Sequence, residues 1–215
     1  MSLRGYLIEG AKELGVGVSE KDADLFFEYL ENLKTWNDKI NLTSIKNDRD
    51  IIISHFLDSI SVAPLIEDGK RVLDIGSGAG FPGIPLKIVR PGLEVTLLDS
   101  VNKKVSFMND TIRKLGLKEI KAVWGRAEEF PNDVPLRHFD YVLNRAVGTI
   151  SDTLKLSSPY VSEGGTIILM RGKRGSEEWN TAIEDVENKF ELVDFKDFTL
   201  PLSDLKRIII ALRPL

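Results

Sequence analysis

The stretch Val72–Gly83 reads VLDIGSGAGFPG and places a glycine-rich turn directly after an apolar run. Glycine reaches backbone conformations that other residues avoid, and it lets a bound molecule come close to the backbone. The apolar run predicts a strand over 71–75, and the residues after the turn predict a short helix that includes 85–89. A glycine turn between a strand and a helix is typical of a ligand-binding loop at the end of a parallel strand.

Strands and helices continue to alternate after this loop. The apolar pattern predicts strands at 71–75, 94–98, 121–124, 141–143, 165–170, 191–198 and 205–212. A helix between the second and third strands has Val101, Val105, Met108, Ile112 and Leu115 on one face. Apolar strands that alternate with helices predict an α/β protein whose largely parallel sheet is covered on both faces.

Residues 1–69 differ from the rest of the chain in their charge and in their apolar pattern. They contain 7 basic and 13 acidic side chains, whereas residues 70–215 contain 22 basic and 20 acidic ones. Their apolar residues recur at helical spacing after Ser19, a plausible N-cap, and again over 48–66. We therefore expect an N-terminal helical extension at 1–69 and a ligand-binding domain at 70–215.

Composition narrows the classes of protein. The 215 residues are 42% apolar and carry a net charge of −4, which is ordinary for a globular protein. The chain has no cysteine, which excludes disulfides and thiolate metal ligands and fits a reducing cytoplasm; we expect no metal site. Arg4, Glu9 and Lys12 interrupt the N-terminal apolar pattern, so we expect neither a signal peptide nor a membrane anchor there.

The glycine loop fits two cofactors in two registers. Gly78, Gly80 and Gly83 match the dinucleotide fingerprint, with an acidic residue at about the expected distance. In that register Pro82 would lie where the backbone must donate to a pyrophosphate, and proline has no amide hydrogen. This mismatch weakens the interpretation as a nicotinamide-dependent oxidoreductase.

The second register begins with Asp74 and places glycines at every second position after it. An anion at this point would repel a pyrophosphate but would suit S-adenosylmethionine, whose ammonium and sulfonium groups are positive. Asp99, at the end of the next strand, would accept hydrogen bonds from the two ribose hydroxyls. The residues therefore favour a methyltransferase that uses S-adenosylmethionine.

The chain also resembles a known family. The segments VLDIGSGAGFPGIPLKI, VTLLDSVNKKVSFMN, GRAEEF and NRAV, preceded by WNDKINLTSI and HFLDSI, are similar to the bacterial glucose-inhibited division protein B family. The resemblance implies a Rossmann-like S-adenosylmethionine-dependent methyltransferase fold with a mostly parallel seven-stranded sheet. It also implies methylation of ring nitrogen 7 of a guanine in small-subunit (16S) ribosomal RNA, free or in an assembling subunit, by an enzyme that we expect to be a monomer.

The resemblance assigns the family's cofactor contacts to the positions of this sequence that match the family's motifs. With Asp74 from the loop pattern, the expected cofactor residues are Gly76, Gly78, Phe81, Asp99, Ser100, Ala127, Glu128 and Arg145. Simpler roles stay open: Phe81 in the core, Glu128 in the first turn of a helix, and Arg145 in a salt bridge to Asp74 or Asp140.

Nitrogen 7 has a free lone pair and no proton, so the reaction needs no general base. Arg145 is the expected catalytic residue, with Asn144 as an acceptor near the cationic product. For RNA we expect contacts from Arg171, Lys173 and Arg174, and from His55, which shares a helix face with Asp58. A solvated basic loop and a core histidine are the alternatives. A methyltransferase that acts on a small molecule or a protein remains the second hypothesis.

Overall fold

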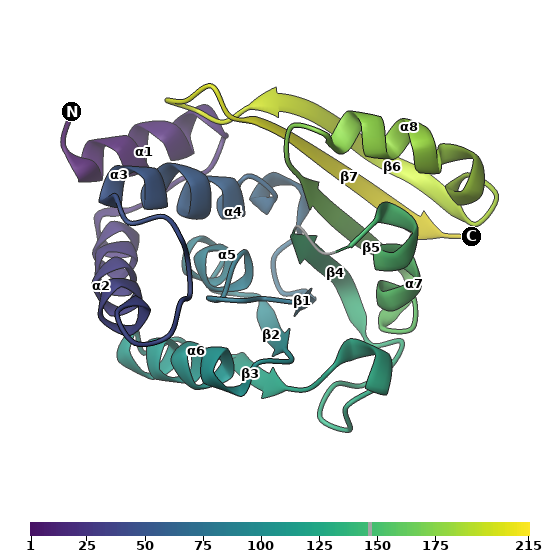
Figure 1. Cartoon of the computed structure of the whole chain (residues 1–215), viewed down its shortest axis with the longest axis horizontal. Helices are drawn as coiled ribbons and strands as arrows, with labels where there is room; N and C mark the ends of the chain where they lie inside the picture. The colour runs from purple at the N-terminus through teal and green to yellow at the C-terminus, as the bar shows by residue number, and fades with distance from the viewer. Residues whose placement is uncertain (146–147) are drawn as a thin grey trace.

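The computed structural model describes residues 1–145 and 148–215. Its seven strands form one sheet in the order β3-β2-β1-β4-β5-β7-β6 (Figure 1). The strands are β1 (Arg71–Ile75), β2 (Glu94–Asp99), β3 (Ile120–Trp124), β4 (Phe139–Arg145), β5 (Val161–Arg171), β6 (Phe190–Thr199) and β7 (Lys206–Pro214). Strands β1 to β5 pair in parallel, and β7 runs antiparallel to both β5 and β6. The predicted, mostly parallel, seven-stranded sheet is confirmed.

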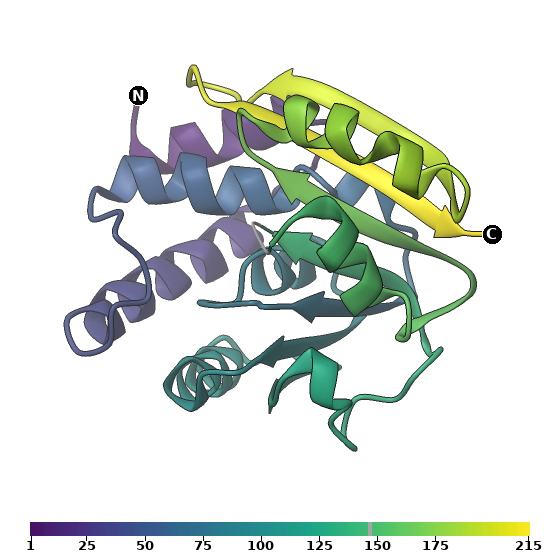
Figure 2. The same cartoon turned by 45° about the vertical axis from the view of Figure 1, so that its right-hand side comes forward.

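Successive residues of each strand point to opposite faces of the sheet, which creates two cores. Val72, Leu97 and Leu143 lie in one core, and Leu73, Leu98 and Val142 lie in the other. The first core contains α5 (Gly83–Val89) and α6 (Asn102–Lys114), and the second contains α7 (Ile150–Ser157) and α8 (Gly175–Val186). Figure 2 shows α7 and α8 together on one side of the sheet. Both faces are therefore covered, as the apolar strands predict.

The N-terminal segment packs on the same face as α5 and α6. It consists of α1 (Leu3–Glu13), α2 (Glu20–Asn37), α3 (Asp48–Ile51), the π-helical η1 (Ile52–Leu57), α4 (Asp58–Ile60) and η2 (Ala63–Leu65). Ser19 caps α2 in a reciprocal capping box with Asp22, which confirms the predicted N-cap. Apolar residues from Leu7 to Ile66 belong to the first core, and the Tyr29 hydroxyl donates to the carbonyl oxygen of Ala79 in the glycine loop. This segment therefore forms part of the support for the loop.

Helices α7 and α8 were not predicted from the sequence, whereas α1 lies within the expected N-terminal helical extension. Helix α7 spans only 8 residues, and α8 contains just four buried residues, so neither shows a long apolar stripe. A turn that contains Pro201 joins β6 to β7, and the amide of Leu200 donates to the carbonyl oxygen of Leu205 across it. Within the described residues, we find no helix with the length and apolarity needed to cross a membrane.

Candidate active site

The glycine loop is folded against the carboxyl end of β2. The amide of Gly76 donates to the carbonyl oxygen of Leu98 at 2.8 Å, and the amide of Gly78 donates to Asp99 Oδ2 at 2.8 Å. Gly80 has φ +85°, and a Cβ there would lie 2.4 Å from Ile84 Cδ1. Positive φ and the lack of space both demand glycine at this position. The loop therefore presents bare backbone at the strand ends.

Five of the predicted cofactor residues line one cleft at the ends of β1, β2 and β3. They are Gly76, Asp99, Ser100, Ala127 and Glu128. Ala127 and Glu128 belong to the 3₁₀ turn η3 (Ala127–Glu129), and the carbonyl oxygen of Ala127 accepts a hydrogen bond from Tyr160 at 2.6 Å. The structure thus brings together residues from three successive strand ends, where open α/β sheets bind their ligands.

The groups in this cleft suit S-adenosylmethionine. Asp99 Oδ1 accepts from the amide of Val101 at 2.8 Å and Oδ2 accepts from Gly78, so the carboxylate is fixed by the backbone. Each carboxylate oxygen can accept a second hydrogen bond, which leaves two positions for a pair of ribose hydroxyls. Leu98 and Leu156 add apolar wall for a flat ring. The donor and acceptor set therefore fits the cofactor.

Asp74 does not lie in this cleft, which corrects its prediction as a cofactor residue. It alternates with Ile75 on β1, so its side chain points into the first core, where it is fully buried. Asp74 Oδ2 accepts from the amide of Gly83 at 2.9 Å at the start of α5. Burial raises the pKa of Asp74 to about 7. Asp74 therefore holds the glycine loop to α5 from within the first core.

Asn144 and Arg145 point to opposite faces of the sheet because they are neighbours in β4. Asn144 is fully buried, and its Nδ2 donates to Ser157 Oγ of α7 at 2.8 Å. Asn144 is therefore a structural contact between β4 and α7, and its prediction as a catalytic residue is wrong. Arg145 points instead toward the N-terminal helices.

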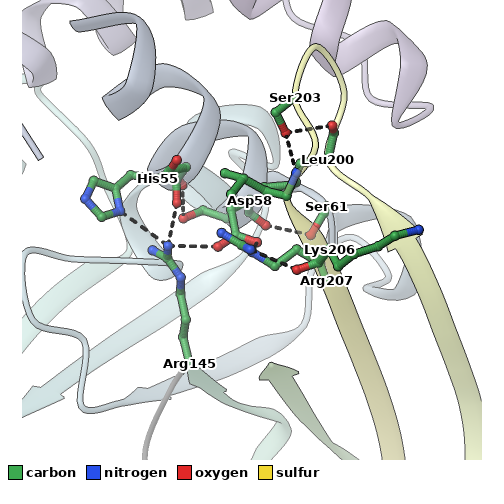
Figure 3. A network of polar contacts seen from close by, with 11 residues as sticks. His55, Asp58, Ser61, Arg145, Leu200, Ser203, Lys206 and Arg207 are labelled. Atoms are coloured by element: carbon green, nitrogen blue, oxygen red, sulfur yellow. Dashed lines mark hydrogen bonds and ion pairs between the residues drawn. The ribbon is translucent and has the colours of Figure 1, made fainter. Parts of the chain in front are cut away.

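Arg145 is the centre of a polar cluster (Figure 3). Its Nη2 lies 2.6 Å from the carbonyl oxygen of Ser54, 2.8 Å from Asp58 Oδ2 and 3.3 Å from His55 Nδ1. Asp58 Oδ1 in turn accepts from Arg207 Nε of β7 at 2.9 Å. The open alternative of a salt bridge to Asp74 or Asp140 is thus replaced by one to Asp58. We define His55, Asp58, Arg145 and Arg207 as the Arg145 cluster.

His55 is an uncharged member of this cluster. Burial, with the nearby charges of Arg145 and Arg207, lowers its pKa to about 3. Arginine only donates hydrogen bonds, so His55 Nδ1 accepts, and the proton sits on Nε2, which lies 2.8 Å from Thr43 Oγ1. The imidazole therefore supplies no positive charge at neutral pH, and its expected contact with RNA stays a prediction.

Phe81 joins the glycine loop to the cluster. Its ring stacks on His55 with centroids 4.6 Å apart, and the Arg145 guanidinium carbon lies 5.7 Å from its centroid. The ring is buried, in agreement with the core alternative, and its contact with a cofactor stays a prediction. Phe81 therefore places Arg145 beside the loop.

Comparison with known proteins assigns the chain to a family. A family model described as GidB, rRNA small subunit methyltransferase G, matches residues 22–201. The chain belongs to this family. The Ribosomal RNA small subunit methyltransferase G of Acetivibrio thermocellus is 45% identical over 99% of this chain and 89% of its own length. The protein of the same name from Thermoanaerobacter pseudethanolicus is 39% identical over 96% and 88%.

Solved structures confirm the fold. A SAM dependent methyltransferase from Aquifex aeolicus aligns with a TM-score of 0.60 at 16% identity, over 85% of this chain and 97% of its own. A predicted O-methyltransferase from Agrobacterium tumefaciens aligns with a TM-score of 0.61 at 19% identity, over 73% and 80%. The Rossmann-like methyltransferase fold expected of the family is therefore present.

Family membership makes the placement of the predicted RNA residues important. Arg171 ends β5 but is buried, and its guanidinium donates to the carbonyl oxygen of Gly148 at 2.9 Å and to Thr153 Oγ1 at 2.8 Å. Its prediction as a phosphate contact is wrong, because it alternates onto the face that α7 covers. Lys173 and Arg174 are exposed in the turn before α8 and stay candidates.

Sequence reasoning missed two members of the Arg145 cluster. The three-residue step from His55 to Asp58 indicated that they share a face, but it gave no partner for Asp58. Arg207 is separated from Asp58 by 149 residues, and no motif connects them. The last two residues of the NRAV motif, 146–147, lie outside the described residues.

Proposed function

We propose that this protein transfers a methyl group from S-adenosylmethionine to ring nitrogen 7 of a guanine in small-subunit ribosomal RNA. The observation that carries the proposal is the single cleft formed by Gly76, Asp99, Ser100, Ala127 and Glu128, in a chain that belongs to the rRNA small subunit methyltransferase G family. The same cleft and family argue against the alternative of a nicotinamide-dependent oxidoreductase. The proposal includes a cytoplasmic monomer that acts on ribosomal RNA, either free or in an assembling subunit.

Bound S-adenosylmethionine supplies an electrophilic methyl group on a sulfonium. The chain then has to hold the acceptor nitrogen in line with that methyl group and to exclude water. Guanine nitrogen 7 has no proton to lose, so the residues need not provide a base. This agrees with His55, whose two ring nitrogens are engaged by Thr43 and Arg145.

Arg145 is the residue best placed to orient a second ligand beside the cofactor loop. In the part of the chain that the structure describes, its Nε and Nη1 have no hydrogen-bond partner, while Nη2 is held by the cluster. Two arginines and one aspartate leave the Arg145 cluster with a net positive charge. Such a site suits an anionic or carbonyl acceptor, such as a phosphate or the O6 atom of a guanine.

The test is methylation of small ribosomal subunits that lack the modification. Purified protein and labelled S-adenosylmethionine should modify the RNA, and nucleoside mass spectrometry should identify 7-methylguanosine against an authentic standard. Deproteinised rRNA in a parallel reaction distinguishes free RNA from the particle as substrate. Cofactor binding without label in either RNA would favour the second hypothesis, a methyltransferase for a small molecule or a protein.

A further inference from the structure

Asp58 is a buried carboxylate that contacts two arginines from two different strands. Its side chain is 4% exposed, and those of Arg145 and Arg207 are 17% and 18% exposed. Oδ2 lies 2.8 Å from Arg145 Nη2, and Oδ1 lies 2.9 Å from Arg207 Nε. Each oxygen therefore serves one arginine, as Figure 3 shows. A buried carboxylate needs such partners because desolvation of an unpaired charge is costly.

The position of Asp58 is itself fixed by the backbone around it. Asp58 follows directly on the π-helical segment η1, and its carbonyl oxygen accepts from Ser61 Oγ at 2.6 Å. Arg207 is held from its other end, because its Nη1 donates to the carbonyl oxygen of Lys206 at 2.9 Å. The carboxylate thus has little freedom to follow Arg145 if that side chain moves. It is a fixed point against which the guanidinium is aligned.

Arg145 depends on this fixed point more than on its other partners. Nη2 carries two protons for three acceptors, and the contact to His55 at 3.3 Å is the longest. The carbonyl oxygen of Ser54 is neutral, so among the described residues Asp58 is the one partner that forms an ion pair with Arg145. Through this bond one edge of the guanidinium is occupied, while Nε and Nη1 stay available among the described residues.

We propose that Asp58 is a positioning residue for methyl transfer, which orients Arg145 toward the ligand and ties the C-terminal hairpin β6–β7 to the site through Arg207. This inference rests on the proposed function, because Arg145 must contact the cofactor or the RNA for its orientation to matter. In this role Asp58 acts through Arg145, because both of its carboxylate oxygens are engaged by arginines. A purely structural ion pair is the competing interpretation.

The test compares Asp58→Asn with Asp140→Asn. Asp140 pairs with Arg71 at 3.1 Å at the opposite, amino-terminal end of β1 and β4, so its loss removes an ion pair far from the site. Single-turnover methylation of small subunits should fall about 10- to 100-fold in Asp58→Asn, the scale for a positioned group displaced by about 1 Å. Asp140→Asn should transfer at the wild-type rate at a temperature where both variants are folded.

A double-mutant cycle separates positioning from stability. If Asp58 acts through Arg145, the variant with both Asp58→Asn and Arg145→Ala should be no slower than Arg145→Ala by itself. Multiplicative losses, or wild-type transfer by folded Asp58→Asn, would overturn the proposal. If Asp58→Asn does not fold, Asp58→Glu takes its place, since it keeps the charge and shifts the carboxylate by one methylene. Positioning then requires slower transfer at an unchanged melting temperature.

A spectroscopic measurement keeps this inference separate from the proposed function. The Nε–H signal of Arg145, assigned by its absence in Arg145→Lys, should be sharp in the wild type and in Asp140→Asn. It should shift and broaden in Asp58→Asn, because the guanidinium loses its anchor. An unchanged signal overturns the positioning role even if the wild-type protein methylates no RNA. A wild type that fails to methylate, with the signal changed as expected, overturns the proposed function instead.

Discussion

The cofactor cleft and the Arg145 cluster differ in how far apart their residues lie in the sequence. The predicted residues of the cleft fall between Gly76 and Glu128, and each ends or follows one of three successive strands. The cluster joins the N-terminal helices to β4 and β7, from His55 to Arg207. Strand ends of a parallel sheet meet at one edge whatever the side chains are, whereas the cluster needs a particular packing of distant elements. The cleft is therefore built from residues that are close together in the sequence, whereas the Arg145 cluster depends on the tertiary packing of distant segments.

The largest effect is expected at Asp74, the buried carboxyl group that holds the glycine loop to α5. The pKa of Asp74 is raised from 3.8 to about 7 in the folded protein, so the protonated, neutral carboxyl group stabilises the fold. This stabilisation is fully present below about pH 4 and is lost as pH rises through the folded pKa. At 1.36 kcal/mol per pKa unit, the wild type should lose up to about 4 kcal/mol relative to Asp74→Asn between about pH 4 and pH 8. Urea unfolding of both proteins at the two pH values measures the difference. A difference that does not change with pH would show that Asp74 is not held neutral.

The local character of the cleft is tested by Asp99→Ala. The Asp99 carboxylate accepts a hydrogen bond from the glycine loop and is predicted to accept hydrogen bonds from the ribose. Its loss should weaken S-adenosylmethionine binding by about 1–3 kcal/mol. Glu94→Ala, at the exposed opposite end of the same strand, is the matched control and should bind normally. Calorimetric titration of both variants gives the result. Normal affinity in a folded Asp99→Ala protein would remove Asp99 from the ribose site.

The variant Arg171→Gln tests whether Arg171, at the end of β5, stabilises the folded protein. The buried guanidinium donates to Gly148 and Thr153, so its loss should lower the free energy of unfolding by about 1–3 kcal/mol. The exposed neighbour in Lys173→Gln should change it by less than about 0.5 kcal/mol. Urea titrations compare the two. Equal stability of the two variants would contradict the assignment of Arg171 to the contact between β5 and α7.

The smallest effect concerns Lys173 and Arg174, the exposed basic pair in the turn before α8. If they contact phosphates, neutralising both should flatten the salt dependence of RNA binding by about 0.7 log–log units for each lost contact to single-stranded RNA. Cofactor affinity should not change, because both residues lie beyond β5 and outside the cleft. RNA affinity at several salt concentrations, for the wild type and the double variant, gives the slopes. Identical slopes would exclude the pair from the RNA site.

Local sequence was sufficient to predict most of the sheet. The seven strands and the capped helix after Ser19 follow from apolar periodicity and capping chemistry, which act over a few residues. Helices α7 and α8 were missed because tertiary packing against the sheet stabilises them more than their own pattern does. The alternation within strands was also readable, and it separates Asn144 from Arg145, although the sequence motif places them side by side.

The sequence by itself determined the alternating α/β order, the glycine loop after β1 and the acidic residue that ends β2, because these depend on backbone conformation and short-range pattern. It also determined that the chain resembles a methyltransferase family. The tertiary structure alone decided that Asp74 and Arg171 are buried, that His55 is uncharged, and that Asp58 joins Arg145 to Arg207. Burial and ion pairing depend on which distant segments cover a side chain, and no local pattern encodes the contact between Asp58 and Arg207, which are 149 positions apart in the sequence.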